Sequence, residues 1–348
     1  DDPSAPAGPI QATPRDARES DGDGAGDGGS NENEEGGVAG GPGQPVIDVM
    51  IVYTTIARIA AGGTNAMIAT AQDAIDFSNE CYPNSGINVR LRMVYCGEVS
   101  YNESGTFVDH INRMNNSSDG ILDEIHTLRD QYSADVVSLW VDDCDPDQNG
   151  NCTLCGRATC NVGAGNPFPI VRWACASGNL SFAHELGHNQ GCGHERTTGE
   201  GACGPDSAHG WFFTGNDGNN YRTVMATVFA PGSRIRYFSN PNVSFRGMPT
   251  GNSSNNNAAQ TANRVGDFEG FRTTHYDLWV NFWDDGGSGT QFDPYNSLGQ
   301  AHANLVTGFN ASENPTIWCY SSVGTERLHL NKRCSIRSCG GTIRIIGN

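Results

Sequence analysis

The most informative part of the sequence is residues 184–194, His184-Glu185-Leu186-Gly187-His188-Asn189-Gln190-Gly191-Cys192-Gly193-His194. Two histidines four residues apart on a helix project from one face, so both imidazoles can reach one metal ion. Glu185 lies beside them, placed to meet a water on the metal rather than the metal itself. Gly191 permits the left-handed backbone that ends a helix, and the turn brings His194 back as a third ligand. A site with three protein ligands keeps one position open, which is typical of catalytic rather than structural zinc.

Chance coincidence is a poor explanation of this pattern. With 9 His and 45 Gly among 348 residues, its five fixed positions would coincide at odds on the order of 10⁻⁵ to 10⁻⁴. The alternative is three histidines with ordinary core or surface roles, and those odds disfavour it.

The extended motif resembles the metzincin signature, whose second element is a methionine-containing turn downstream. Here Met225, in Thr223-Val224-Met225-Ala226-Thr227, follows His194 by 31 residues. The resemblance implies that Met225 lies beneath the metal as a hydrophobic floor and does not ligate it. Within the metzincins, the chain resembles the reprolysin-like (adamalysin-type) peptidases and their bacterial relatives. The segments that carry this resemblance are residues 47–54, 85–91, 179–183 and 237–241.

One position departs from the reprolysin pattern. Reprolysins usually place Asp directly after the third histidine, whereas this chain has Glu195. Glu is found there in astacins, but their turn carries a tyrosine two residues after the methionine, where this chain has Thr227. We therefore expect no tyrosine ligand, and we expect Glu195 to hydrogen-bond the backbone near the site and support the ligands.

The resemblance implies a zinc endopeptidase acting on proteins or peptides. Zinc would lower the pKa of its bound water toward ~7, and Glu185 would take the proton and pass it to the leaving amine. Substrates of this family lie extended along an edge strand of the sheet. By position, we expect that strand to be Ala158-Thr159-Cys160-Asn161-Val162-Gly163.

Two other functions compete with this one. The first is a non-catalytic adhesion or carbohydrate-binding protein that uses the C-terminal part of the chain, and the second is a zinc hydrolase acting on something other than peptides. The intact histidines and Glu185 disfavour an inactive scaffold.

Hydrophobic periodicity predicts a mixed α/β fold. Runs with the pattern of strands cover residues 46–53, 87–95, 135–141 and 169–174. Runs with helical spacing cover residues 65–79, 118–131 and 177–190. Strands that alternate with helices favour a mixed, mostly parallel sheet. Together with this pattern, the resemblance implies a metzincin-type catalytic domain over residues 46–272, with an active-site helix that carries the first two histidines.

The two ends of the chain differ from this central part. Residues 1–45 are rich in Gly, Pro, Asp and Glu, which predicts a disordered acidic leader or linker. Residues 273–348 predict a small β-rich domain, because residues 279–298 and 341–345 resemble the beginning of a right-handed parallel β-helix. Such a module would contact a surface or polysaccharide, and the alternative is a domain that only caps the peptidase.

Composition excludes several classes of protein. The formal net charge of −18 leaves no basic face for nucleic acid. No apolar run reaches the ~20 residues that a membrane-spanning helix needs. Twelve cysteines, an even number at close spacings, favour disulfides and an oxidising compartment, so we expect a secreted, extracellular protein.

The cysteine-rich loop leaves two further expectations. Cys144, Cys152, Cys155 and Cys160 have spacings that a structural zinc could use, but disulfides are favoured. A bridge between Cys192 and Cys203 would brace the His194 loop. Calcium is a second candidate cofactor, because the start of a calcium loop is matched by Asp145, Asp147 and Asn149. Gly156 stands where the loop needs Glu, so a plain Asp/Asn-rich turn is the favoured alternative.

Overall fold

The computed structural model describes residues 44–144, 154–199, 203–227, 229–272, 277–280, 287, 294–298, 300–301, 316–320 and 335–339. The predicted leader lies almost wholly outside these residues, as do the candidate calcium ligands Asp145, Asp147 and Asn149. The chain divides into two compact units, of which the larger holds residues 40–277 and 290–293.

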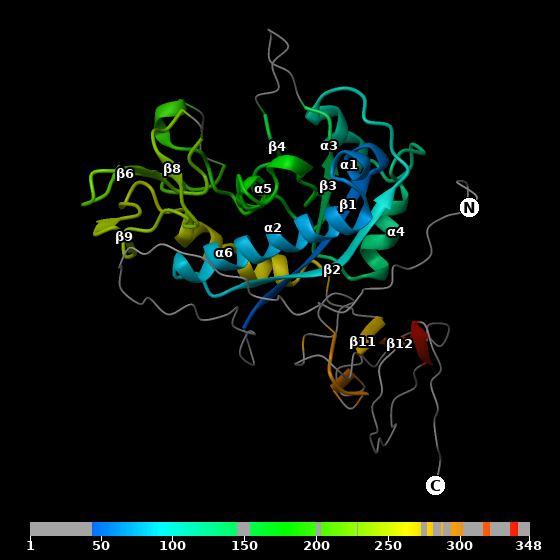
Figure 1. The fold of residues 1–348 in the computed structure, drawn as a ribbon. Helices are drawn as coiled ribbons and strands as arrows, with labels where there is room; N and C mark the ends of the chain where they lie inside the picture. Colours follow the sequence, from blue (N-terminus) through cyan, green and yellow to red (C-terminus); the bar gives the residue numbers. More distant parts are fainter. Residues whose placement is uncertain are drawn as a thin grey trace, which may run out of the picture. The chain divides into compact units, whose positions relative to one another are not determined.

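The larger unit is built on a five-stranded sheet of order β2-β1-β3-β5-β4 (Figure 1). Its strands are β1 (Val46–Thr54), β2 (Arg90–Val99), β3 (Val136–Val141), β4 (Gly156–Arg157) and β5 (Ile170–Arg172). Four strands are parallel, and β4 pairs antiparallel with β5 at the edge. The predicted mixed, mostly parallel sheet is confirmed.

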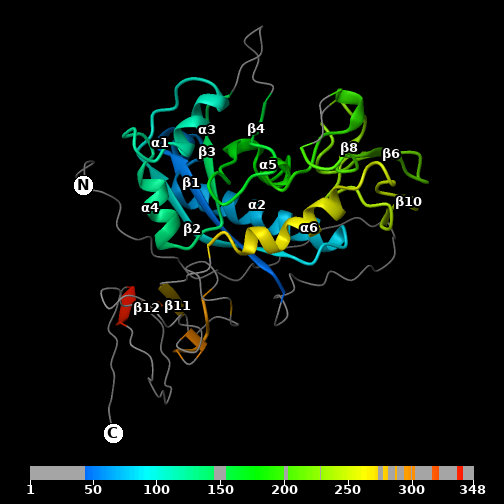
Figure 2. The same cartoon turned by 180° about the vertical axis from the view of Figure 1, so that it is seen from behind.

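Helices cover both faces of this sheet because alternate residues of its strands point to opposite sides. Ile47, Val49 and Ile51 belong to one hydrophobic cluster, and Met50 and Val52 belong to the other. The first cluster includes side chains of α1 (Thr55–Ala60), α2 (Thr64–Asn84), α5 (Ser181–Asn189) and α6 (Asn257–Glu269). The second includes side chains of α3 (Phe107–Asn115) and α4 (Glu124–Gln131). Figure 2 shows the same layers from behind.

Several helices differ from the sequence prediction, since α1 and α3 were not predicted and α2 ends at Asn84 rather than residue 79. The helix predicted over residues 118–131 begins only at Glu124, because Gly120 and Leu122 have left-handed backbone conformations, with φ of 79° and 60°. The active-site helix begins at Ser181 rather than residue 177, since Leu180 is also left-handed, with φ of 56°. Helix α6 was not predicted because its buried face carries polar residues such as Gln260, whose Nε2 donates to the Gln190 carbonyl at 3.0 Å.

Beyond α5 the chain forms short strands and turns. Three strands make a small sheet: β6 (Phe212–Thr214), β7 (Asn220–Arg222) and β8 (Ser233–Arg234). A hairpin follows, made of β9 (Ser244–Phe245) and β10 (Met248–Pro249). Two 3₁₀ turns, η1 (Trp173–Cys175) and η2 (Arg196–Thr198), flank the active-site helix in sequence.

Toward the C-terminus the described residues form a separate three-stranded sheet of order β11-β12-β13. Its strands are β11 (Asp277–Val280), β12 (Thr316–Tyr320) and β13 (Ser335–Cys339), and β12 runs parallel to β13. Val280, Ala301 and Ile317 are buried together. The predicted run at 341–345 lies outside the described residues, so a β-rich domain over residues 273–348 stays a prediction.

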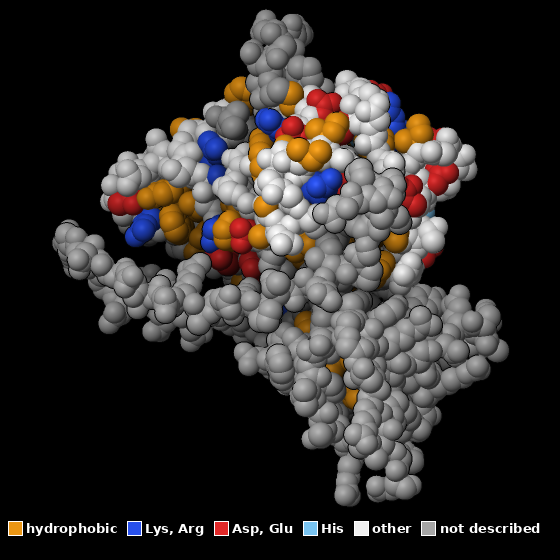
Figure 3. All heavy atoms as spheres, turned by 45° about the vertical axis from the view of Figure 1, so that its right-hand side comes forward, with side chains coloured by type: hydrophobic (Ala, Val, Ile, Leu, Met, Phe, Trp, Pro, Cys, Tyr) orange, Lys and Arg blue, Asp and Glu red, His pale blue; other side chains and the backbone are white. Residues whose placement is uncertain are grey.

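The surface carries both signs of charge. On the face drawn in Figure 3, Arg side chains lie among Asp and Glu side chains rather than in one basic patch. Among the described residues, no helix combines the length and the apolar character that crossing a bilayer requires.

Candidate metal centre

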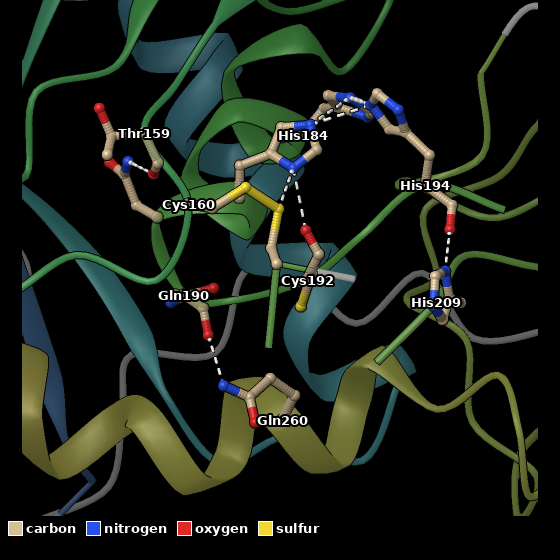
Figure 4. The surroundings of a disulfide bond; sticks show 11 residues. Thr159, Cys160, His184, Gln190, Cys192, His194, His209 and Gln260 are labelled. Carbon is tan, nitrogen blue, oxygen red and sulfur yellow. Dashed lines mark hydrogen bonds between the residues drawn. A yellow bond between two sulfur atoms is a disulfide. The ribbon is translucent and has the colours of Figure 1, made fainter. Parts of the chain in front are cut away.

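Three imidazoles converge where α5 ends. His184 and His188 project from one face of α5, and the chain turns after the helix to bring back His194 (Figure 4). Their Nε2 atoms lie 3.2 Å apart for His184 and His188, 3.1 Å for His184 and His194, and 3.0 Å for His188 and His194. The structure therefore assembles the predicted triad around a single point.

The other ring nitrogens fix the protonation of two of these imidazoles. Nδ1 of His184 lies 2.9 Å from the Val224 carbonyl oxygen, and Nδ1 of His188 lies 2.9 Å from that of Cys192. Because a carbonyl only accepts, each Nδ1 carries the proton and each Nε2 keeps a lone pair. Burial and the neighbouring imidazoles lower the pKa of His188 to about 3 and the pKa of His184 well below its usual value.

This donor set fits zinc. The unprotonated Nε2 atoms of His184 and His188, 3.2 Å apart, cannot hydrogen-bond each other, and their lone pairs would repel without a cation between them. Tetrahedral zinc with Zn–N bonds of about 2.0–2.1 Å places its nitrogen ligands about 3.3 Å apart. The separations found here are close to that value.

The turn after the helix positions the third histidine. Gly191 has a left-handed backbone, with φ of 91°, and Cys192 donates its N–H to the Gly187 carbonyl at 2.9 Å. The backbone of His194 is then held from outside the motif, because Nδ1 of His209 donates to its carbonyl at 2.7 Å. Sequence spacing gave no indication of His209, which is not one of the converging imidazoles.

Met225 packs against α5 between the first two histidines, at Gly187. It is fully buried, and a Cβ added at Gly187 would stand 2.4 Å from its sulfur and 3.3 Å from the ring of Phe238. The helix therefore needs glycine at position 187 to sit on the methionine. The residue before Met225 supplies the carbonyl that orients His184.

Glu185 lies beside the triad in a buried position. Burial raises its pKa to about 8, and the charges of Arg234 and Arg157 act in the opposite direction. A Cβ added at Gly156 on the edge strand would stand 2.7 Å from Cγ and Oε1 of Glu185. Glycine at 156 therefore leaves room for the carboxyl group, a role that the sequence pattern did not indicate.

Glu195 binds the turn that contains Met225. Its Oε2 accepts the N–H of Thr227 at 2.8 Å, and its Oε1 accepts the Thr227 hydroxyl at 2.6 Å. The carboxylate is 1% exposed, so both bonds are shielded from water. Glu195 therefore ties the segment after the third histidine to the methionine turn, which is the kind of contact expected for it.

The chain is similar to a known family of peptidases over most of this unit. A family model for metallo-peptidase family M12, of reprolysin type, matches residues 43–239, more than half of the chain. The chain belongs to metallopeptidase family M12. The predicted identification as a reprolysin-like metallopeptidase is confirmed, and the family implies a zinc cofactor, for which the three histidines provide a site.

Similar proteins agree with this assignment. The peptidyl-Asp metalloendopeptidase of Stenotrophomonas maltophilia (strain R551-3) is 36% identical over 212 residues, covering 60% of this chain and 48% of that protein. The peptidyl-Asp metalloendopeptidase of Xanthomonas campestris pv. campestris is 36% identical over 211 residues, covering 60% and 47%. The chain thus spans about half the length of the curated relatives it matches.

A likeness to solved structures concerns the fold alone. The "Structure of a chaperone-substrate complex" matches with a TM-score of 0.52 at 20% identity, covering 66% of this chain and 39% of the other.

Two disulfides of this M12 chain have both cysteines among the described residues, and the one bridge that was predicted by residue number is not among them. Cys160 bonds to Cys203, and Cys155 bonds to Cys175. The expected bridge between Cys192 and Cys203 does not form, because Cys192 is turned into the core, where its sulfur lies 3.3 Å from the Thr261 hydroxyl. The described loop cysteines form disulfides rather than a structural zinc site, as favoured.

The predicted substrate strand is also wrong in position. The edge strand is β4, Gly156–Arg157, and the residues after it lie outside any strand. They instead satisfy carbonyl groups at the C-terminal end of α5. The N–H of Asn161 donates to the His188 carbonyl at 2.9 Å, and the N–H of Val162 donates to the Asn189 carbonyl at 3.0 Å. The displaced prediction covered Ala158, Thr159, Cys160, Asn161, Val162 and Gly163.

The contact between Glu195 and the methionine turn leads to a test. We expect Glu195→Gln to lower the free energy of unfolding by about 1–3 kcal/mol, because one accepting oxygen is replaced by an amide that cannot accept from Thr227. Zinc affinity should fall about 10-fold. Urea unfolding and zinc competition measure the two effects, with exposed Glu124→Gln as the control. Wild-type values in both assays would contradict this role.

The Cys160–Cys203 disulfide lies against a histidine of the triad, with the Cys203 sulfur 3.5 Å from Nδ1 of His188 (Figure 4). Replacing both cysteines with serine should cost about 4 kcal/mol of stability, since the bond closes a loop of 43 residues, and should weaken zinc binding. The same change at Cys155 and Cys175, 20 residues apart, should cost about 3 kcal/mol and leave zinc binding close to wild type. Equal zinc affinities of the two double variants would refute the link to His188.

Proposed function

We propose that this chain is a secreted, zinc-dependent endopeptidase in which His184, His188 and His194 bind the metal and Glu185 is the general base. The convergence of three Nε2 atoms within 3.0–3.2 Å of one another is the observation that supports it most directly. Membership of metallopeptidase family M12 supports the reaction class. The non-catalytic adhesion protein is not favoured, because it gives the convergent imidazoles and the buried Glu185 no role.

Zinc bound there would supply Lewis acidity that polarises the peptide carbonyl and acidifies water. The chain's own part is the movement of protons. Glu185 takes a proton from the attacking water and passes it to the leaving amine, so that the amine departs as a neutral group. Glycine at position 156 leaves room for the Glu185 carboxyl group, which must meet these two partners in turn.

Substrate binding uses the sheet edge. In this proposal an extended substrate pairs with β4, Gly156–Arg157, whose outer edge has no further strand in the five-stranded sheet. Because the curated relatives are named peptidyl-Asp metalloendopeptidases, we propose that the preferred bonds adjoin aspartate.

The proposed secretion is supported by the disulfides. The Cys155–Cys175 and Cys160–Cys203 disulfides support an oxidising compartment. Contact of residues 273–348 with a surface or polysaccharide also stays a prediction.

One experiment tests the proposed activity. The purified protein should contain one zinc per chain, digest casein, and cleave a peptide library at bonds next to aspartate. A zinc chelator should abolish cleavage, and added zinc should restore it. Zinc-loaded protein that cleaves no peptide would contradict the proposal, and cleavage without any preference for aspartate would contradict its substrate class.

A further inference from the structure

Two arginines lie side by side next to the turn that contains Met225. Arg222 on β7 and Arg234 on β8 are direct partners in the register of the small sheet. Their guanidinium groups are near enough that Arg222 lowers the pKa of Arg234, although burial is the larger cause. Like charges held together in a half-buried place repel, and the charges of Glu185 and Glu195 act on Arg234 in the opposite direction without cancelling the shift.

Among the described residues, neither guanidinium has a carboxylate partner within salt-bridge distance. Arg234 donates through Nη1 to the Asn179 carbonyl at 2.7 Å and through Nη2 to the Ala226 carbonyl at 2.9 Å. Arg222 donates to the Ala230 carbonyl at 3.3 Å. The Nε atoms of both arginines are buried and have no hydrogen-bond partner within the described structure. Each Nη atom carries two hydrogens, so Arg234 keeps one further donor at Nη1 and one at Nη2 beyond the two carbonyls that it binds in the described structure.

The pair lies next to the reaction centre. The charge of Arg234 acts on both Glu185 and His184, and its Nη2 holds the carbonyl of Ala226, the residue that follows Met225. Arg157 also acts on Glu185, but its side chain is exposed. An exposed guanidinium is solvated by water and gains little from a carboxylate, whereas a buried one gains more.

We propose that Arg234, backed by Arg222, binds the side-chain carboxylate of the substrate aspartate and so determines the preference for that residue. This inference rests on the proposed function. A planar guanidinium with free N–H groups accepts a carboxylate through paired hydrogen bonds, which a neutral amide of the same shape cannot reproduce. Asparagine in the substrate could accept through its amide oxygen only, and would leave the second donor and the charge of the guanidinium without compensation.

The test compares two peptides that differ only in Asp or Asn beside the cleaved bond. The measured quantity is the ratio of their kcat/KM values, which a general disturbance of the fold would not change selectively. For the wild type we expect a ratio of about 100 in favour of Asp. Arg234→Gln should reduce the ratio to nearly 1, Arg234→Lys should keep part of it, and Arg222→Gln should lower it about 10-fold.

Arg157→Gln is the matched control, and it should keep the wild-type ratio. The proposal is overturned if Arg234→Gln retains the preference, or if Arg157→Gln removes it. A wild type that cleaves both peptides equally would refute the aspartate preference itself, and one that cleaves neither would refute the proposed peptidase. Zinc content, measured on every variant, separates loss of recognition from loss of the metal.

Discussion

Glu185→Gln should lower kcat/KM for peptide hydrolysis by about 10²- to 10⁴-fold while the protein still binds one zinc. Glutamine has nearly the same volume as glutamate, so the contact with Gly156 is kept. The amide cannot accept a proton from the attacking water, and the reaction loses its general base. The three imidazoles keep their partners, because the bonds from His184 and His188 go to backbone carbonyls rather than to Glu185.

This change is measured by peptide cleavage together with metal analysis of the same sample. Glu124→Gln, on α4 and exposed, is the control and should behave as wild type. Turnover by Glu185→Gln within about 10-fold of wild type would exclude Glu185 as the base. Loss of zinc from that variant would instead assign Glu185 a structural role at the centre.

His194→Ala should remove most zinc and, with it, all measurable hydrolysis. Structural zinc sites bind with about 10–16 kcal/mol, so one of three protein ligands accounts for an affinity loss of about 10²- to 10⁴-fold. His194 lies after the helix, and its removal leaves α5 and the two other imidazoles in place. The variant should therefore stay folded, with far-ultraviolet circular dichroism like the wild type.

The measurement is a zinc competition titration with a chromogenic chelator. His126→Gln is a suitable control, because the His126 ring packs against Phe168, and Phe168 belongs to the cluster on the other face of the sheet. Equal zinc affinities of His194→Ala and wild type would remove His194 from the ligand set. A variant that has lost its circular dichroism would show that the His194 loop is needed for folding, and His188→Ala would then test the ligand set.

Much of this site was predictable because its determinants are local. The spacing of His184 and His188 is a property of one helix, and Gly191 ends that helix with a backbone conformation that few other residues adopt. The strand at 46–53 was equally plain, since a run of apolar residues buried on both faces is typical of a central parallel strand. These features needed no knowledge of distant contacts.

Other features depended on residues far apart in the chain, and these features were either not predicted from the sequence or predicted wrongly. Cys192 is next to the zinc motif, which suggested a bond to Cys203, but the packing of α6 puts Thr261 against its sulfur. Cys203 instead meets Cys160, 43 residues away. The predicted strand over residues 158–163 also fails, since Asn161 within it has a left-handed backbone, with φ of 50°.

The family, the three convergent histidines and the acid beside them could be read from the chain alone, because helix periodicity and a glycine turn bring these side chains together within eleven residues. The contacts that orient them depend on tertiary packing. The Val224 carbonyl reaches His184 across 40 residues and Thr227 reaches Glu195 across 32, and the same packing sets Arg234 beside Arg222. Such contacts have no periodicity to reveal them, since they arise only when the sheet, α5 and the methionine turn pack around one core.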